Sequence, residues 1–193
     1  MKKINANTRS IAIKIASQAF LDNPSMNQFL NPRIAKEKAM HALCAHCVDL
    51  SMLKDGAYIS DDMCCICLLF HSDSKVDFWD LLRLNFQFVM RCCGWAKVYR
   101  ILKREKFMKT MRMQGEYLYC QILANNKQAG NASVIEAKKF MFDMGDRLNL
   151  PIVAETCLSK NKVVYEHFGF KTYGNCLLPH CDVKMWFLKR APV

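Results

Sequence analysis

The chain has 193 residues, of which 52% are hydrophobic and 23% are charged. The length suits one domain with a self-sufficient core, and the composition excludes collagen-like, low-complexity and wholly disordered chains. The formal net charge of +11 favours anionic partners, which include nucleic acid, a membrane surface and phosphorylated ligands. Because no internal repeat or linker composition interrupts the chain, we expect residues 1–193 to form a single domain.

The N-terminal residues and the 11 cysteines indicate in which cellular compartment the protein is expected. Lys2 and Lys3 resemble the start of a signal peptide, but polar residues follow where an apolar stretch would be needed. The longest apolar run, Met63–Phe70, is far shorter than the ~20 residues of a membrane span. We therefore expect a cytoplasmic protein without a membrane segment, whose cysteines are reduced and serve mostly as small buried hydrophobic residues.

The first half of the chain is typical of three helical segments and one hairpin. Apolar residues at helical spacing predict the first helix, a first-turn proline begins the second, and a glycine interrupts the third. Two short apolar runs around a pair of aspartates predict the hairpin. The helices are expected at Ile11–Leu21, Pro32–Leu53 and Phe78–Met113, with a break at Gly94, and the hairpin at Ala57–Ser60 and Cys64–Phe70.

The second half alternates strands with helices. Strands are expected at Glu116–Ala124 and Pro151–Cys157, each followed by a helix, at Ala132–Leu148 and Asn161–His167. A final antiparallel pair is expected at Lys171–Cys176 and Val183–Leu188. A strand–helix–strand–helix core between antiparallel strands predicts an α/β or α+β protein.

The segment Ala124–Ser133, between a predicted strand and a predicted helix, suits an anion. Gly130 and its small neighbours allow a ligand to approach the backbone closely, and the first N–H groups of a helix lack intrahelical partners. Lys127 adds a positive charge. The alternative is an ordinary strand-to-helix turn with Asn131 as the N-cap residue.

Two motifs together resemble the GNAT superfamily of acyl-CoA N-acyltransferases. In that family a strand leads into an R/Q-x-x-G-x-G/A loop, and an N-x-x-x-Y-x-x-x-G-F element follows near the end of the chain. Gly130 and Ala132 match the loop, in which Lys127 stands at the Arg or Gln position. The second element is matched by Asn161, Tyr165, Gly169 and Phe170, and Phe20–Pro24 is similar to an early segment of the aminoglycoside- and puromycin-type members. The resemblance implies a mixed, mostly antiparallel twisted sheet flanked by helices.

The resemblance also implies acetyl-CoA as the cosubstrate. In the family, loop amides bind the CoA pyrophosphate and the pantetheine arm pairs with the preceding strand. The corresponding residues are Lys127, Gln128, Ala129, Gly130, Asn131, Ala132 and Ser133 for the loop, and Ile122, Leu123 and Ala124 for the strand. Asn161 is an expected contact of pantetheine or CoA, and its alternative role is a helix N-cap.

In the family an amine attacks the thioester directly and a thiolate departs. Tyr165 is the expected proton donor to that sulfur, because a tyrosine hydroxyl, with a pKa near ~10, stays protonated at neutral pH. Its alternative is a packing role beside Phe168. Glu155 is the expected base that takes the proton of the amine, directly or through water, and its alternative is a strand-end glutamate paired with a lysine. Tyr117 and Tyr119 are further residues that could line the site.

Two other patterns carry less weight. Cys44, His46 and Cys47, with His41 one turn earlier, suggest zinc, but no set of four ligands has zinc-like spacing, so we predict no metal. The segment 91–112 has a net charge of +7 and contains Trp95, Tyr99 and Phe107. It is interpreted as a solvated helix face with an apolar core side, and the alternatives are a nucleic-acid surface or attraction of CoA to the cleft.

We therefore expect transfer of an acetyl group from acetyl-CoA to a primary amine of a small molecule, with no membrane partner and no nucleic-acid partner. The alternative is a non-catalytic basic module that binds nucleic acid or protein. No motif in the first helices or in 78–113 identifies the acceptor.

Overall fold

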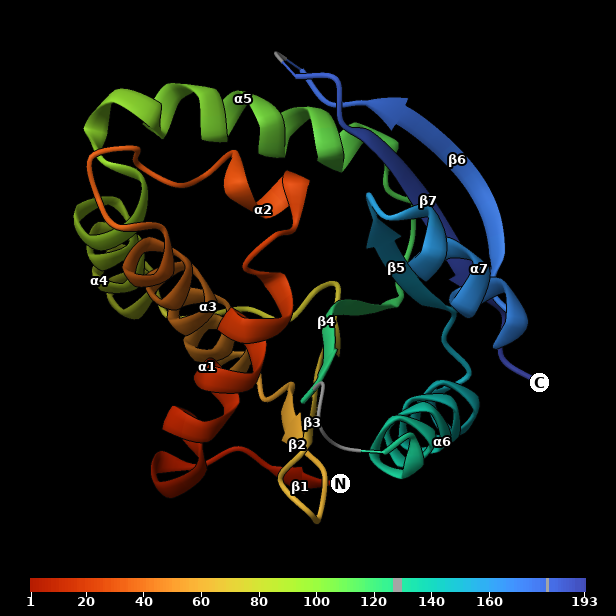
Figure 1. The fold of residues 1–193 in the computed structure, drawn as a ribbon. Coiled ribbons are helices and arrows are strands. Elements are labelled where there is room, and N and C mark those ends of the chain that lie inside the picture. Colours follow the sequence, from red (N-terminus) through yellow and green to blue (C-terminus); the bar gives the residue numbers. More distant parts are fainter. Residues whose placement is uncertain (127–129, 180) are drawn as a thin grey trace.

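A seven-stranded mixed sheet forms the centre of the protein in a computed structural model that describes residues 1–126, 130–179 and 181–193 (Figure 1). The strand order is β1-β2-β3-β4-β5-β7-β6, and only β4 and β5 pair in parallel. This arrangement confirms the predicted fold class. The strands are β1 (Lys2–Lys3), β2 (Ala57–Ile59), β3 (Cys65–His71), β4 (Leu118–Asn125), β5 (Ile152–Thr156), β6 (Lys171–Leu177) and β7 (Lys184–Arg190).

Helices cover both faces of the sheet (Figure 1). Alternation along β3 divides the core, because Ile66 and Leu68 pack with α1 and α3 whereas Cys67 and Leu69 pack with α6. Among the described residues no helix is long and apolar enough to cross a membrane. The helices are α1 (Ala6–Phe20), α2 (Pro24–Asn27), α3 (Lys36–Leu53), α4 (Phe78–Phe88), the π-helical turn η1 (Val89–Cys93), α5 (Trp95–Met111), α6 (Ala132–Leu148) and α7 (Ser159–His167).

Helices α1 and α3 begin four or more residues from their predicted starts. Helix α1 begins at Ala6, because the Asn5 side chain accepts hydrogen bonds from the N–H groups of Asn7 and Thr8 and completes a capping box. Helix α3 begins at Lys36 and not at Pro32. There the Asn31 side chain accepts a hydrogen bond from the N–H of Arg33 at 3.0 Å, which makes a turn around the proline. Strand β1 and helix α2 were not predicted, since both are too short to show a period.

The predicted break at Gly94 is confirmed. Gly94 has φ = +70°, a conformation that favours glycine, and its N–H donates to the carbonyl of Val89 at 2.7 Å to close the π-helical turn. Helix α5 then runs along the top of the view in Figure 1, from α4 to the β6–β7 hairpin, where Met108 packs against Met185 and Phe187. It therefore crosses from one half of the sheet to the other.

Strands β4 and β5 part in the middle of the sheet. Their last paired residues are Cys120 and Ala154, although β4 continues to Asn125. At the same place β4 has a bulge, because Leu68 and Leu69 of β3 pair with Ile122 and Cys120 and leave Gln121 as the extra residue. Bulges re-aim side chains and end pairing. As a result, the edge of β4 beyond Cys120 no longer pairs with β5.

Candidate active site

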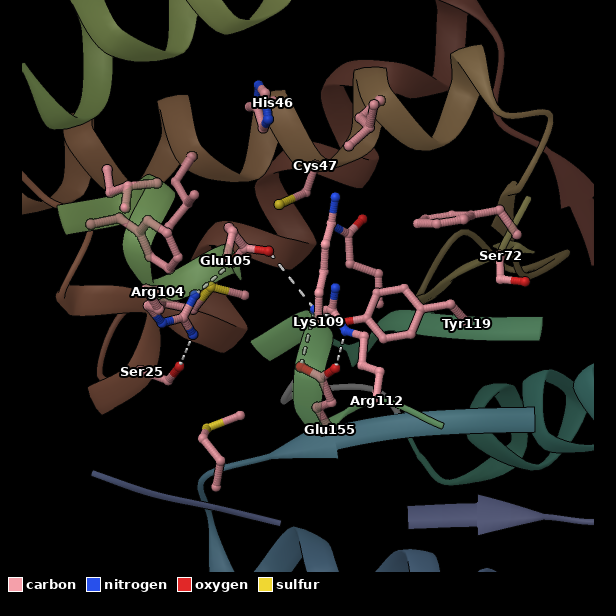
Figure 2. Close-up of a pocket in the computed structure, with 18 of the residues that line it drawn as sticks. Ser25, His46, Cys47, Ser72, Arg104, Glu105, Lys109, Arg112, Tyr119 and Glu155 are labelled. Carbon is pink, nitrogen blue, oxygen red and sulfur yellow. Dashed lines mark hydrogen bonds and ion pairs between the residues drawn. The ribbon is translucent and has the colours of Figure 1, made fainter. Parts of the chain in front are cut away.

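A cavity of about 960 Å³ opens where β4 and β5 part. Its wall is contributed by α2, α3 and α5 and by the strands β3, β4 and β5, and Asn161 and Tyr165 of α7 reach it from the other half of the sheet. Figure 2 shows charged residues of α5 projecting toward β5 across this space. The cavity is thus enclosed by segments far apart in the sequence.

An ion pair between α5 and β5 dominates the cavity (Figure 2). Arg112 Nε donates to Glu155 Oε1 at 2.5 Å, and Arg112 Nη2 donates to Glu155 Oε2 at 3.4 Å and to the Tyr119 hydroxyl at 3.2 Å. The side chains of Arg112 and Glu155 are only 17% and 8% exposed. Burial alone would lower the pKa of Arg112, but Tyr119 and Glu155 outweigh it and raise that pKa, so the guanidinium stays charged.

A second charged pair extends this network toward α2. Arg104 donates to Glu105 Oε1 at 3.0 Å and to the Ser25 hydroxyl at 2.8 Å, and its guanidinium lies over the ring of Phe29 at 4.5 Å. Glu105 Oε2 lies 3.9 Å from Arg112 Nη2 and joins the two pairs. Helix α5 therefore faces the cavity with alternating charges that neutralise one another.

Two lysines on the cavity wall are not neutralised in this way. Within the described ranges, the side-chain ammonium groups of Lys54 and Lys109 form no hydrogen bond and no ion pair. The ammonium of Lys54 lies 4.2 Å from the centre of the Phe70 ring. Its pKa is lowered by burial and by the positive charges of Arg112 and Lys109. This part of the cavity is therefore positively charged.

Tyr165 is held in place by the end of α7. Gly169, with φ = +96°, donates its N–H to the carbonyl of Glu166, and Phe170 donates to the carbonyl of Tyr165 at 3.0 Å. These two bonds define a Schellman motif, and the Tyr165 and Phe170 rings pack at 5.2 Å as that motif favours. Burial raises the pKa of Tyr165 well above its usual value, and the nearby Cys120 and Cys67 thiols contribute further to this increase. The hydroxyl is therefore protonated at neutral pH.

The other predicted contacts divide between the cavity and the core. Asn161 and Leu123 line the cavity. Helix α7 begins at Ser159, so the alternative that Asn161 is the N-cap is wrong. The side chains of Ile122 and Ala124 are buried among α1 and α3, which leaves only their backbone groups for a ligand.

Helix α6 begins at Ala132, as predicted, and a side chain at Gly130 would meet no atom of the described residues within 4 Å. Asn131 occupies the N-cap position, but its side chain makes no capping hydrogen bond. The Ser133 hydroxyl is buried and donates to Asp62 Oδ2 at 2.6 Å, so a carboxylate from the β2–β3 turn lies at this helix end. The predicted contacts Lys127, Gln128 and Ala129 lie outside the described residues.

The expectation of buried cysteines is confirmed for seven of the eleven, including Cys65, Cys67 and Cys120 in strands. Burial raises the pKa of the Cys47 thiol to about 12 and also raises that of Cys44. Such thiols are neutral at pH 7, whereas zinc binds thiolates. No cluster of metal-ligating side chains occurs in the described parts of the chain.

The interpretation of the basic segment 91–112 holds in part, because five of its eight cations are exposed and its Met108 is buried. The other three cations turn inward: Lys97 donates to the carbonyl of Gln28, while Arg104 and Arg112 form the cavity ion pairs. Trp95 and Tyr99 are 65% and 73% exposed, and of the three aromatic residues only Phe107 packs against a buried cluster.

Arg112 and Glu105 were not identified individually from the sequence. Their roles depend on α5 reaching β5, and a contact between residues 43 positions apart leaves no periodic signal. His46, which lines the cavity and stacks on Phe88 at 4.6 Å, was considered only together with the cysteines beside it. Burial lowers the pKa of His46, so its imidazole is neutral at pH 7.

Solved structures share this arrangement. No protein-family model and no curated protein sequence matches the chain. A structure from Corynebacterium glutamicum, described as histone acetyltransferase HPA2 and related acetyltransferase, superposes with a TM-score of 0.68 at 10% identity over 100% of this chain and 95% of that one. Arylalkylamine N-acetyltransferase 2 from Aedes aegypti gives 0.61 at 12% identity over 98% and 97% of the chains. A polyamine N-acetyltransferase from Drosophila melanogaster gives 0.60 at 7% identity over 98% of both. The protein has the fold of GNAT acetyltransferases.

Proposed function

We propose that this protein transfers an acetyl group from acetyl-CoA to a primary amine of a small molecule. The observation that carries the proposal is that the acceptor-sized cavity reaches the parting of β4 and β5, where it is lined by the hydroxyl-bearing Tyr165. Acetyl-CoA and the amine could therefore approach the same point of the cavity from two sides. The structural neighbours include proteins described as acting on arylalkylamines and polyamines, which supports an amine acceptor.

The donor side uses backbone groups. Beyond Cys120 the edge of β4 that faces β5 is free to pair with a pantetheine arm, which carries amide groups of its own. The arm would lead toward the start of α6, where the open space at Gly130 can receive the pyrophosphate. Asp62 opposes this placement with a negative charge, so its removal should strengthen binding.

The chemistry is a direct transfer. The amine nitrogen forms a bond to the thioester carbon, the carbon–sulfur bond breaks, and the departing thiolate receives a proton. Tyr165 is the proposed donor of that proton, since its hydroxyl stays protonated and the residue lines the cavity.

Glu155 is better assigned to positioning than to proton abstraction. Both of its oxygens accept hydrogen bonds from Arg112, so the carboxylate is directed toward the guanidinium and not toward an amine in the cavity. The pairing alternative therefore fits Glu155 better, although its partner is an arginine. Instead, the positive charges of Lys54 and Lys109 lower the pKa of an amine bound nearby, so that it binds in its neutral, nucleophilic form.

Thiol release from acetyl-CoA, followed with a panel of arylalkylamines, polyamines and amino acids, tests the proposal. We expect amine-dependent release and an acetylated product of the corresponding mass. Tyr165→Phe serves as the matched control, because it keeps the ring packed on Phe170. If acetyl-CoA binds but no amine in the panel accelerates thiol release, the acceptor class is wrong. If acetyl-CoA does not bind at all, the proposal fails as a whole.

A further inference from the structure

Helices α4 and α5 expose an unusual number of large apolar side chains. Trp79 is 71% exposed and Tyr99 73%, and elsewhere in the described residues such side chains occur singly or in adjacent pairs. Soluble monomers rarely leave a large contiguous apolar area in water. We refer to this area as the α4–α5 apolar surface, which consists of Phe78, Trp79, Leu82, Phe86, Met90, Trp95, Tyr99 and Leu102.

The two helices form one continuous surface. The rings of Phe86 on α4 and Trp95 on α5 are in edge contact at 6.3 Å. On α4, Leu84 and Phe88 are buried, so the helix is apolar both toward the core and away from it. Core packing therefore accounts for only one side of α4, and the other side requires an apolar partner.

The charges around this surface indicate what the partner is. Residues 75–106 contain eight Lys or Arg and three Asp or Glu, a net charge of +5. Arg83, Arg100 and Lys103 are exposed on the same two helices, and Arg91 is exposed on the turn η1 that joins them. A second copy of the chain would bring equal positive charges together, which opposes self-association. Nucleic acid would satisfy the cations but not the broad apolar area between them.

We propose that the α4–α5 apolar surface docks on an anionic lipid bilayer, which replaces the expectation of no membrane partner. Helices that lie in a membrane interface combine Trp, Phe and Leu on one face with Lys and Arg beside them, and they need no membrane-spanning length. This pattern matches α4 and α5 and is compatible with the absence of a spanning helix among the described residues. Leu102 belongs to this surface and also lines the cavity, so the bilayer would lie next to the acceptor cavity.

Co-sedimentation of the full chain with vesicles tests this proposal. We expect binding to vesicles of phosphatidylcholine mixed with phosphatidylserine, and weaker binding to phosphatidylcholine alone or at high salt. The double variant Trp79→Ser/Trp95→Ser should bind at least about tenfold more weakly, because two aromatic side chains no longer enter the interface. Ile135→Ser/Val163→Ser is the matched control, since both residues are more than 60% exposed on α6 and α7.

Charge reversal separates the electrostatic contribution. Arg91→Glu/Arg100→Glu should lower binding to the anionic vesicles at least about tenfold and leave binding to phosphatidylcholine unchanged. Unfolding midpoints equal to wild type show that each variant is folded, since all the substituted residues are exposed.

Three results would overturn the proposal. The first is no binding to either vesicle by the folded wild-type chain. The second is binding that the control pair reduces as much as the tryptophan pair does. The third is a dimer in light scattering that Trp79→Ser/Trp95→Ser dissociates, which would assign the surface to a second copy of the chain.

Discussion

The role of Glu155 can be decided by its replacement with glutamine. The side chain keeps its shape but loses its charge, so Arg112 remains in a site where it is only 17% exposed. Removing one partner of a buried ion pair costs ~3–5 kcal/mol. Glu105, with Oε2 at 3.9 Å from Arg112 Nη2, and the Tyr119 hydroxyl remain as partners, so we expect the lower end, ~3 kcal/mol. For a chain of this size that corresponds to a fall of ~6–12 °C in the unfolding midpoint.

Calorimetry and steady-state thiol release on the same samples provide the assay. Glu116→Gln is the matched control, because Glu116 also lines the cavity but is 64% exposed, and its loss should change stability by less than ~0.5 kcal/mol. The double variant Arg112→Met/Glu155→Leu should regain most of the lost stability, since no unpaired charge remains. A Glu155→Gln protein with an unchanged midpoint and a ~10²–10⁴-fold slower transfer would refute this reasoning and make Glu155 the base.

Three further predictions concern the donor site, the proton donor and acid stability. Tyr165→Phe should slow acetyl transfer by ~10²–10⁴-fold with unchanged acetyl-CoA affinity in calorimetry, because only the transferable proton is lost. Gly130→Glu should weaken acetyl-CoA binding without unfolding the chain, since a side chain there meets open space, whereas Asp62→Asn should strengthen binding about two- to fivefold by removing a like charge. The hydrogen bonds from Arg190 lower the pKa of Asp146, so this pair stabilises the fold above the ordinary aspartate value of ~3.9, and its contribution is lost as the pH falls through the lowered value. In Asp146→Asn, the free energy of unfolding measured with urea should depend less on pH in that range.

Each of these predictions has a contrary outcome. Full activity in Tyr165→Phe, under conditions where chemistry limits the rate, would leave Tyr165 as a packing residue. Equal acetyl-CoA affinity in folded Gly130→Glu would remove the pyrophosphate from the start of α6. An acid profile that Asp146→Asn does not change would show that the pair with Arg190 contributes nothing in solution.

Local patterns predicted the elements that depend on nearby residues. Helix α6 begins and ends at the predicted residues, because its apolar positions recur with the helical period between a polar loop and a left-handed Asn149. Gly169, the glycine of the second motif, follows the end of α7 with a positive φ, which glycine adopts without strain. The bounds of a helix could therefore be predicted where hydrophobic periodicity is followed by a residue that ends the helix.

The site was only partly readable, because its geometry comes from long-range contacts. The motif identified Tyr165 and Asn161 as residues that share a site, and both do line one cavity. The bulge at Gln121 and the pairing of Arg112 with Glu155 depend on which strand lies beside β4 and where α5 ends. Neither the bulge nor the ion pair produces a recognisable pattern within a short stretch of sequence.

The same limit applies to the exposed apolar residues of α4. Its apolar residues extend from the core-facing side onto the exposed side, so periodicity could not distinguish the core-facing Leu84 from the exposed Phe86. Only the packing against α3 decides which face is covered. The inward-turned cations of the basic segment were not predicted for the same reason, since the position of Arg104 depends on Ser25 and Glu105.

Calorimetric titration of the full chain with acetyl-CoA is the decisive measurement for an acetyl-CoA-dependent transferase. We expect binding of one acetyl-CoA per chain, with an affinity that falls in Gly130→Glu and is unchanged in Tyr165→Phe. A folded wild-type protein that takes up no acetyl-CoA would contradict it, whatever else the cavity binds.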